Sequence, residues 1–542
     1  MLSILRDVSA SLAHAGVSTS AQVALSLGLL LLLGSLRSSL QSTTGSSTPH
    51  SRKLALTPAS TLPILGNTVD LVKNGLRFHD WVTEQCVAAQ GRPWIMKALG
   101  RPDVIVVSTL EAYEDVTKTQ FENFIKGDYV RDVLKDVFGV GIFTLDGAKW
   151  AHSRRLSSQL FSMRQLRDSM TKSIEKHVQS LCSVFKDASA ADTVASNKTL
   201  DLCKVLTQFT TEAFCEIAFG IEMDYLTSDK EHPLQVALDG ATRALDIGLE
   251  GQLKQHVKAL DAIVLDLIAQ SIEHHAKHDD EGGNANPKSD LISLFLSQAA
   301  PKKDKDAAAL AADGGGDGKE LDQPDEKVTP ESLKYMAMQF LLAGRETTAQ
   351  TLSWFFLLLS QHPEVETKIR NELKQKSLTA SSDTDGDGSA STAQRLVYLE
   401  AALKETVRLY PSAPITARDA DKDTTLSDGT FIPAGTRVGL PAYAMARLPS
   451  VWGKDAAEFK PERWIDQDTG KLVHVSSFKF VPFLAGPRSC IGVNLAMLEM
   501  KIVLAHILSR FHVDVLPNQS VSYDMSITLP MNAPLLVRVR KA

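Results

Sequence analysis

Apolar and polar positions along this chain follow mostly the period of an α-helix. Apolar residues recur at helical spacing over 166–186, 200–219, 331–361 and 493–510. Short runs rich in β-branched residues near Val104 and near the C-terminus predict strands. The pattern therefore predicts a mainly α fold with a small β region.

The N-terminal segment has a different pattern, because no charged residue occurs from Ala15 to Leu36 and its second half is strongly apolar. About 20 such residues span the hydrocarbon core of a bilayer as a helix. Basic residues follow from Arg37 onward, which predicts that the C-terminal side faces the cytosol. We therefore expect residues 1–14 to precede a single N-terminal transmembrane helix over 15–36. A cleaved signal peptide is the alternative, but the apolar run is long and the charge order is reversed.

Polar stretches divide the rest of the chain. Residues 37–57 are predicted to be a tether, and 58–542 to form the body. Residues 300–327 are rich in Ala, Asp, Lys and Gly, and 377–394 are also polar. Such segments cannot bury a core, so we expect both to be disordered insertions in the body.

The second insertion contains Asp383-Thr-Asp-Gly-Asp-Gly388, which resembles the first half of a calcium-binding loop. The twelfth position of such a loop would be Gln394, where a bidentate glutamate is required. A solvated loop is the preferred interpretation, and calcium binding is the alternative.

Charge and cysteine content exclude some classes of protein. The net charge is −6, from 58 basic and 64 acidic residues among 542, so no nucleic-acid partner is expected. The five cysteines are odd in number and lack the paired spacing of zinc sites, which favours a reducing compartment. Four of them lie in apolar or helical surroundings typical of buried thiols. Cys490 differs.

The residues around Cys490 suit a thiolate ligand of haem iron. The start of a predicted helix follows the cysteine, and its backbone amides would lower the pKa of the thiol. Gly486 and Gly492 let the backbone turn close to a flat cofactor. Arg488 supplies a cation for a haem carboxylate, and Phe483 supplies an apolar shield over the sulfur. A buried free cysteine is the alternative, which these spacings disfavour.

This stretch resembles the haem-binding loop of the cytochrome P-450 superfamily. The resemblance extends from about Pro58 to Val539 with the motifs in the order of the family. The two polar insertions depart from the family pattern, but both fall between predicted elements. The resemblance implies the cytochrome P-450 fold, with haem b (iron protoporphyrin IX) buried in its centre.

A second motif lies midway along the helical pattern of 331–361. Taken alone, small residues there indicate a helix–helix contact. The resemblance implies that Ala343 and Gly344 let the helix approach the haem and leave room for dioxygen. It also implies that Thr347 hydrogen-bonds the oxygen and that Glu346 passes protons toward it. O–O cleavage needs those protons and an electron push from the thiolate.

The resemblance also implies partners for the haem propionates. Trp150 and Arg154 are four residues apart in a predicted helix and would reach one propionate together. Arg418 resembles another propionate ligand.

A further motif is structural in the family. Glu405 and Arg408 are three residues apart on one helical face, which alone would indicate a weak surface ion pair. The resemblance implies a buried pair joined by Arg463, which holds the region behind the haem.

The implied activity is insertion of one oxygen atom from O2 into a C–H bond of a lipophilic substrate. About fifty residues follow Cys490, too few for a flavin domain, so electrons would come from NADPH through a separate flavoprotein reductase. We expect this reductase to dock on a basic patch that includes Lys479, Arg488 and Lys501. The anchor predicts the endoplasmic reticulum membrane, a cytosolic catalytic domain and contact with membrane lipid.

The segments 139–150, 217–220 and 343–348 look most like the branch of the family that hydroxylates fatty acids and alkanes near the chain terminus. The tail segment 527–533 is expected to form a turn that lines the pocket. One alternative is a peroxide isomerase of the same fold that needs no reductase, but such members generally lack the acid–alcohol pair. A non-catalytic haem carrier or sensor is the other alternative, and the intact pair argues against it.

Overall fold

The computed structural model describes most of the predicted body. The described residues are 53–161, 169–190, 199–226, 228, 231–246, 250–280, 291–292, 330–380, 393 and 395–542. The predicted anchor, the insertion 300–327 and the Asp-rich segment at 383–388 lie outside these ranges. The predicted disordered insertion 377–394 is wrong at its start, because helix α15 (Pro363–Ala380) continues through its first four residues. Within them, no helix combines the length and the apolar character needed to cross a bilayer.

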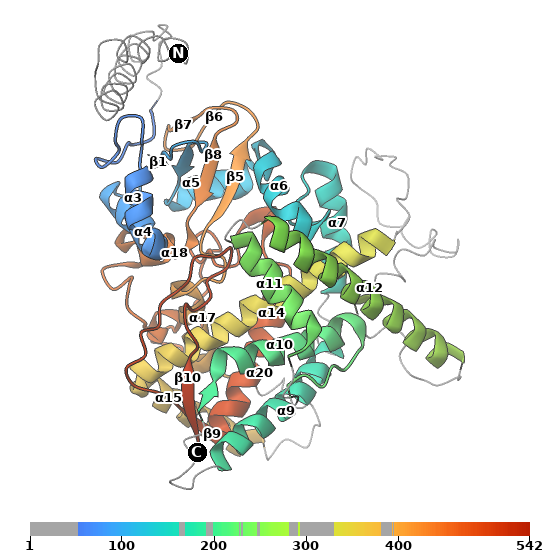
Figure 1. The fold of residues 1–542 in the computed structure, drawn as a ribbon. Helices are drawn as coiled ribbons and strands as arrows, with labels where there is room; N and C mark the ends of the chain where they lie inside the picture. The colour runs from blue at the N-terminus through green and yellow to red at the C-terminus, as the bar shows by residue number, and fades with distance from the viewer. Residues whose placement is uncertain are drawn as a thin grey trace, which may run out of the picture.

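The described chain is mainly α-helical, as predicted. The helices are α3 (Thr68–Lys73), α4 (Phe78–Ala88), α5 (Leu110–Glu114), α6 (Gly127–Phe138), α7 (Gly147–Leu160), α9 (Thr171–Ala190), α10 (Leu202–Phe219), α11 (Pro233–Asp246), α12 (Glu250–Asp280), α14 (Pro330–Gln361), α15 (Pro363–Ala380), α17 (Val397–Leu409), α18 (Ala442–Arg447), α19 (Pro449–Trp452) and α20 (Val493–Arg510). Figure 1 shows α14 crossing the middle of the molecule, with α9, α10, α11 and α12 on one side.

The strands are short and gather mainly at the other end of the molecule (Figure 1). They are β1 (Trp94–Met96), β2 (Val104–Val106), β3 (Phe124–Ile125), β4 (Leu200–Asp201), β5 (Thr416–Ala420), β6 (Thr424–Thr425), β7 (Phe431–Ile432), β8 (Arg437–Leu440), β9 (Phe511–Val515) and β10 (Leu536–Lys541). The largest sheet has the order β1-β2-β8-β5-β3, and only its β2–β8 pair is parallel. A second sheet has the order β4-β10-β9, and β6 pairs with β7.

The largest core lies among the helices. It includes Phe185 of α9, Phe209 of α10, Phe355 of α14 and Ile502 of α20, all with no exposed surface. Helix α10 begins where the Asp201 side chain accepts a hydrogen bond from a backbone N–H of the first turn, which satisfies an otherwise unpaired donor. This core fixes α14 against α10 and α20. Helix α14 carries the predicted oxygen groove, and the cysteine loop directly precedes α20.

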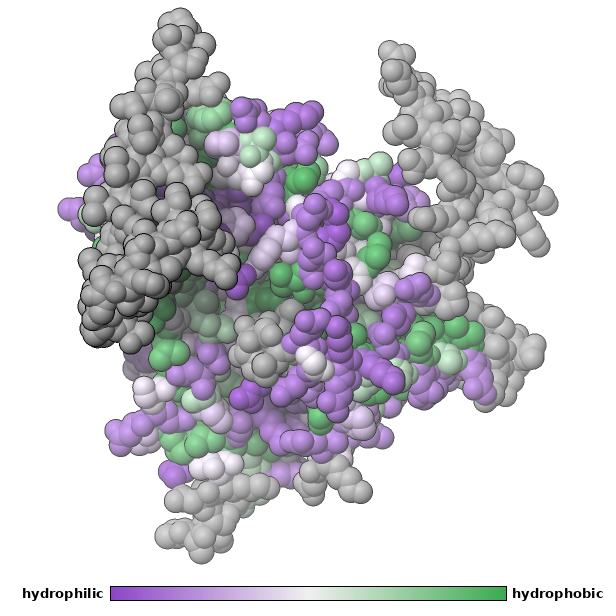
Figure 2. Space-filling view, turned by 45° about the horizontal axis from the view of Figure 1, so that its top comes forward, coloured by the Kyte–Doolittle hydropathy of each residue, from purple (hydrophilic) through white to green (hydrophobic). Residues whose placement is uncertain are grey.

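The exposed surface mixes polar and apolar side chains. Figure 2 shows hydrophilic residues interspersed with small hydrophobic patches over one face. Among the most exposed large apolar side chains are Leu54, Val72 and Leu76, at 72%, 79% and 87%. All three lie near the start of the described chain, which begins at Lys53 within the last residues of the predicted tether 37–57.

Candidate active site

The cysteine loop is closed by its own backbone. The Cys490 N–H donates to the Phe483 carbonyl oxygen at 2.8 Å, and the Ser489 N–H donates to Gly486 at 3.0 Å. Gly486 has φ +68°, and a Cβ there would lie 2.0 Å from the Thr117 carbonyl oxygen. Only glycine satisfies both constraints, so this position fixes the loop against the segment that carries Thr117.

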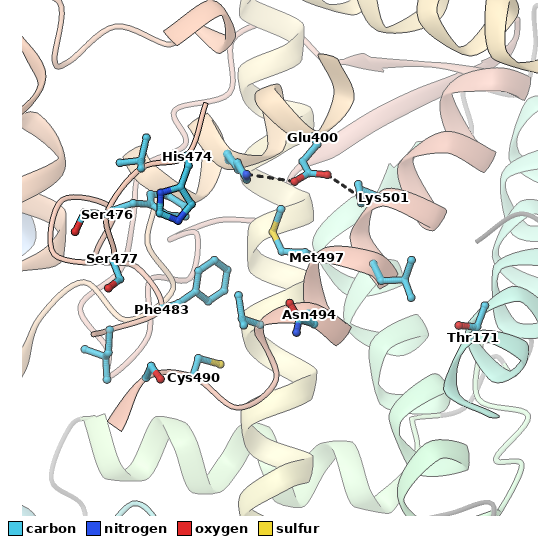
Figure 3. A pocket seen from close by; sticks show the side chains of 17 residues that line it. Thr171, Glu400, His474, Ser476, Ser477, Phe483, Cys490, Asn494, Met497 and Lys501 are labelled. Atoms are coloured by element: carbon cyan, nitrogen blue, oxygen red, sulfur yellow. Dashed lines mark hydrogen bonds and ion pairs between the residues drawn. The ribbon is translucent and has the colours of Figure 1, made fainter. Parts of the chain in front are cut away.

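Cys490 lines a cavity of about 840 Å³, together with Phe483, Asn494 and Met497 (Figure 3). Its side chain remains accessible through this cavity although the surroundings are dense. Burial raises the pKa of the Cys490 thiol, while backbone N–H groups of Gly492 and Val493 and the charge of Arg154 act to lower it. The lowering influences expected from the sequence are present, but burial outweighs them in the polypeptide.

Arg488 is partly satisfied by protein groups. Its Nη2 donates to Asp146 Oδ1 at 2.6 Å and to the Leu145 carbonyl oxygen at 3.0 Å. Its Nε and Nη1 are buried with no hydrogen-bond partner among the described residues. The guanidinium also lies 4.5 Å from the Trp150 ring centroid, so stacking holds it in place. Two donors of a fixed cation are therefore left for an acceptor.

Two further cations lie close to Arg488. Arg418 is 3% exposed and its Nη1 donates to the Ala417 carbonyl oxygen at 2.8 Å. Burial, followed by repulsion from Arg488, lowers the pKa of Arg418 to about 10. Burial, Arg418 and Arg488 hold the pKa of Lys126 well below its usual value. Asp146 is the carboxylate that the described chain places beside this group, so positive charge is in excess.

These features fit haem. Arg488, with two buried nitrogens that have no acceptor, and the neighbouring buried Arg418 match the propionates, because an unpaired buried charge is costly unless a ligand neutralises it. A Cβ at Gly492 would meet no atom within 4 Å, so the backbone there faces open space. The role of Cys490 as the sulfur ligand of haem iron remains a prediction.

Sequence reasoning did not identify Lys126 and Asp146 as part of this group. Lys126 follows the apolar Phe124 and Ile125, and Asp146 lies in the segment 139–150, but no local pattern indicates that either charge pairs near Arg488. Only the tertiary contacts with Arg418 and Arg488 reveal their place.

Trp150 and Arg154, predicted to act together, contact different parts of the protein. Arg154 Nη2 donates to the Ser489 carbonyl oxygen at 2.5 Å, so it holds the cysteine loop. Trp150 is buried, with the Arg488 guanidinium over its ring and the Phe121 ring packed against it at an interplanar angle of 53°. The joint contact of Trp150 and Arg154 with one propionate remains a prediction.

The four predicted residues of α14 lie on one turn but have different surroundings. The Thr347 hydroxyl donates to the Ala343 carbonyl oxygen at 2.7 Å. A Cβ at Gly344 would lie 2.3 Å from the Phe214 ring on α10, so this glycine permits close packing of the two helices. Glu346 Oε1 accepts hydrogen bonds from Arg345 and from Thr242 of α11. The roles of all four toward dioxygen remain predictions.

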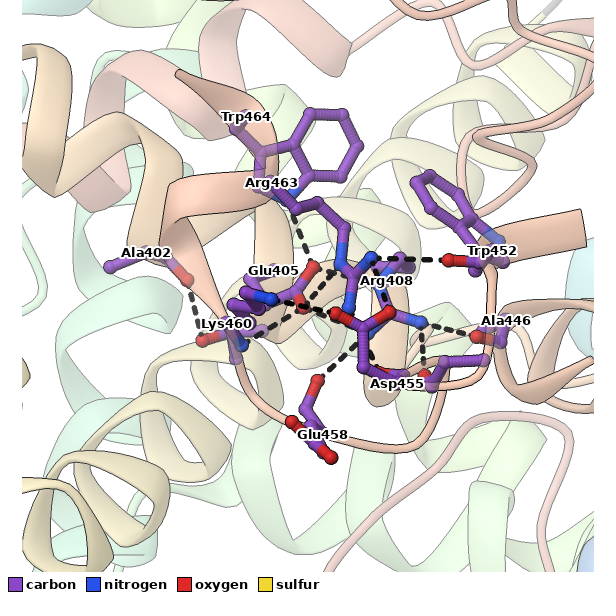
Figure 4. Close-up of polar contacts among 12 residues, drawn as sticks. Ala402, Glu405, Arg408, Ala446, Trp452, Asp455, Glu458, Lys460, Arg463 and Trp464 are labelled. Carbon is purple, nitrogen blue, oxygen red and sulfur yellow. Dashed lines mark hydrogen bonds and ion pairs between the residues drawn. The ribbon is translucent and has the colours of Figure 1, made fainter. Parts of the chain in front are cut away.

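The predicted network around Glu405 is confirmed (Figure 4). Arg408 Nε and Nη2 donate to the two Glu405 oxygens at 2.7 and 2.8 Å, and Arg463 Nε donates to Glu405 Oε1 at 3.0 Å. Trp464 Nε1 adds a bond of 2.9 Å to Glu405 Oε2. The Arg408 Nη1 atom reaches main-chain carbonyls at Ala446 and Ala456. The network joins α17 to the segment that precedes the cysteine loop.

The predicted basic patch for a reductase is wrong in two of its members. The Lys501 side chain is 9% exposed and its Nζ lies 2.8 Å from Glu400 Oε2, because α20 faces α17 at this point. Arg488 is buried beside Asp146. Lys479 lies over the Trp452 ring at 4.8 Å and is partly exposed. The first two cations are therefore used inside the protein.

Comparison with known proteins identifies the fold and its relatives. The sequence model described as cytochrome P450 matches residues 57–533. Cytochrome P450 94B1 of Arabidopsis thaliana is 31% identical over 88% of this chain and 90% of its own length. Cytochrome P450 86B1 of the same plant is 32% identical over 79% and 75%. The crystal structure of the cytochrome P450DA heme domain superposes with a TM-score of 0.72 at 20% identity, covering 90% of this chain and 96% of that one.

Proposed function

Since this chain belongs to the cytochrome P450 family and is a monooxygenase, we propose that it hydroxylates a long-chain lipid, with a fatty acid as the first candidate. Support for the substrate comes from 139–150, 217–220 and 343–348, which resemble the fatty-acid and alkane branch of the family. Support for haem chemistry comes from Arg488, two residues before Cys490, whose buried guanidinium leaves two nitrogens without an acceptor.

Haem, when bound, supplies the activation of dioxygen, with one oxygen atom inserted into a C–H bond and the other leaving as water. In this proposal, Cys490 ligates the iron, and Arg488, Arg418 and Lys126 hold the propionates by charge and hydrogen bonds. The oxygen groove would be formed by Ala343 and Gly344.

Glu346 and Thr347 are proposed to hold and pass protons during oxygen cleavage. A carboxylic acid and a hydroxyl on adjacent residues can relay a proton when both lie within hydrogen-bond reach of the reacting group. The Thr347 hydroxyl uses its one hydrogen in its bond to the Ala343 carbonyl oxygen. Its lone pairs can therefore accept a hydrogen bond from a second donor.

Electrons are proposed to come from NADPH through a membrane-bound flavoprotein reductase. The predicted anchor over 15–36 and the exposed Val72 and Leu76 support a position at the endoplasmic reticulum membrane, with the body in the cytosol. Docking would use the partly exposed Lys479 rather than Arg488 or Lys501.

The first experiment is an absorption spectrum of the dithionite-reduced protein with carbon monoxide, beside a Cys490→Ser variant. A strongly red-shifted Soret band that disappears in the variant is expected for thiolate-ligated haem. A folded wild-type protein that binds no haem would contradict the site assignment.

The second experiment supplies a competent reductase, NADPH and labelled lauric or palmitic acid. Hydroxylated product with NADPH consumption is expected. No product with either acid would count against the fatty-acid proposal. Turnover of a lipid hydroperoxide without NADPH would favour the isomerase instead, and no NADPH consumption with any lipid would favour a carrier or sensor.

A further inference from the structure

A fully buried arginine joins three helices next to the proposed proton-transfer acid. Arg345 of α14 has 0% exposed surface, and its Nε donates to Thr211 Oγ1 of α10 at 3.0 Å. Its Nη1 lies 3.2 Å from Glu346 Oε1, and its Nη2 donates to Asp239 of α11. Burying a guanidinium is costly unless its donors are well paired, so this arrangement strongly favours one relative position of the three helices.

Helix α11 also contacts the acid directly. The Thr242 hydroxyl donates to Glu346 Oε1 at 3.1 Å, the same oxygen that Arg345 binds. Thr242 and Asp239 are three residues apart and therefore share one face of α11. This face thus reaches Glu346 by two routes, one direct and one through Arg345.

We propose that α11 positions the Glu346 carboxylate for proton transfer, with Thr242 and Arg345 as positioning residues and Asp239 as the support of Arg345. This inference rests on the proposed role of Glu346 as the acid of the reaction. Two donors on one oxygen fix the rotation of the carboxylate, which is what directional proton transfer requires. Displacement of α11 would break the Thr242–Glu346 and Asp239–Arg345 hydrogen bonds together.

The test is Thr242→Val, which keeps the shape of the side chain and removes the hydroxyl. Hydrogen peroxide released per NADPH should rise about fivefold, the effect expected from one lost hydrogen bond, and the solvent isotope effect on turnover should change. The reduced carbon monoxide spectrum should be retained. Thr242→Ser should restore wild-type coupling.

The matched control is Asp261→Asn. Asp261 of α12 pairs with Lys334 of α14 at 3.0 Å, so this ion pair also joins a second helix to α14. Lys334 lies about three turns along α14 from Glu346. Coupling of NADPH to product should not change in this variant. Equal uncoupling in Asp261→Asn and Thr242→Val would overturn the proposal, because any loosening of α14 would then suffice.

A readout independent of turnover is a double-mutant cycle of Thr242→Val and Glu346→Ala, each of which removes the hydrogen bond between the two side chains, followed by thermal unfolding. The loss in unfolding midpoint should be smaller in the double variant than the sum of the single losses. Strict additivity would overturn the contact itself.

Glu346→Gln separates the two levels of the argument. If it uncouples the enzyme while Thr242→Val does not, the positioning role of α11 is wrong and the acid stands. If Glu346→Gln leaves coupling and isotope effect unchanged, the proposed acid is wrong and the inference falls with it.

Discussion

Among the described residues, the buried arginines around Glu405 and those around Asp146 differ in how completely they are paired. Around Glu405, the Arg408 guanidinium donates to both carboxylate oxygens and to main-chain carbonyls, and Arg463 adds a second cation to the same carboxylate. Around Asp146, Arg488 leaves two buried donors unused, and Arg418 bonds only a carbonyl of its own strand among the described contacts.

The difference separates a structural role from a binding role. A buried guanidinium whose donors are all paired contributes to one arrangement of the chain and has nothing left to offer a ligand. A buried guanidinium with unused donors costs stability until an anion supplies the missing acceptors. The Glu405 group therefore belongs to the fold, and the Asp146 group is proposed to belong to the cofactor.

The largest expected effect is that of Glu405→Gln. It leaves two buried arginines without their carboxylate, which destabilises a protein by about 3–5 kcal/mol. We expect a lower thermal unfolding midpoint or a failure to accumulate folded protein, measured by circular dichroism and expression level. A variant with wild-type unfolding would show that the paired group is dispensable.

Arg418→Met should have the opposite effect on the polypeptide. It replaces an uncompensated buried cation by an apolar side chain of similar length, so the haem-free protein should unfold at an equal or higher temperature. Haem should dissociate about tenfold faster, because a charge-assisted hydrogen bond is worth about 1.5–3 kcal/mol. Transfer of haem to an acceptor protein measures this rate. Arg408→Met is the matched control, and equal unfolding of both variants would remove the distinction between the groups.

A third buried group, of mixed charge, predicts sensitivity to rising pH. Burial acts to lower the pKa of His177, but Glu212 and Glu216 raise it to about 9, and burial raises the pKa of Glu499 to about 8. The folded state therefore holds protons that the unfolded state releases, so stability falls as pH rises from about 4.5 to 8 for Glu499 and from about 6.5 to 9 for His177. The unfolding midpoint should fall over these ranges.

His177→Gln is the variant that tests this interpretation. It should flatten the pH dependence of the unfolding midpoint, because the imidazolium that gains charge between Glu212 and Glu216 is gone. The same slope in His177→Gln and in the wild-type protein would assign the loss to other groups.

The smallest expected effect is that of Lys368→Ala. Lys368 lies 2.5 Å from Glu462 at the edge of the paired group, but its side chain is 52% exposed. Exposed ion pairs contribute about 0–1 kcal/mol, so the unfolding midpoint should change by no more than a few degrees. A loss as large as that of Glu405→Gln would show that the network extends to the surface.

Much of the fold could be predicted from apolar periodicity. The expected stretches 200–219, 331–361 and 493–510 correspond closely to α10, α14 and α20. The stretch 166–186 overlaps α9, which extends further to Ala190. Apolar residues mark these helices because α10 and α14 are buried around most of their surface in the same core.

The chemistry near Cys490 was predictable where neighbours in sequence carry it. Glycines beside the cysteine act on their own loop, so local spacing reveals them. Lys126 and the burial of Lys501 depend on elements that are distant in sequence, so no local pattern identifies them. A lysine in a helix has the same sequence signature whether it faces water or, like Lys501, a glutamate on another helix.

The contacts that join the cysteine loop to the N-terminal half of the chain also determine when the site can form during synthesis. Arg154 and Ser489 are 335 residues apart, and Asp146 and Arg488 are 342 apart. A ribosome adds about 5–20 residues per second, so the N-terminal half of the site waits tens of seconds for its partner during synthesis. These contacts can hold haem only after nearly the whole chain has been synthesised. Its capture therefore follows synthesis of nearly the whole polypeptide, and a chain that stops before Arg488 would lack both these contacts and the cysteine.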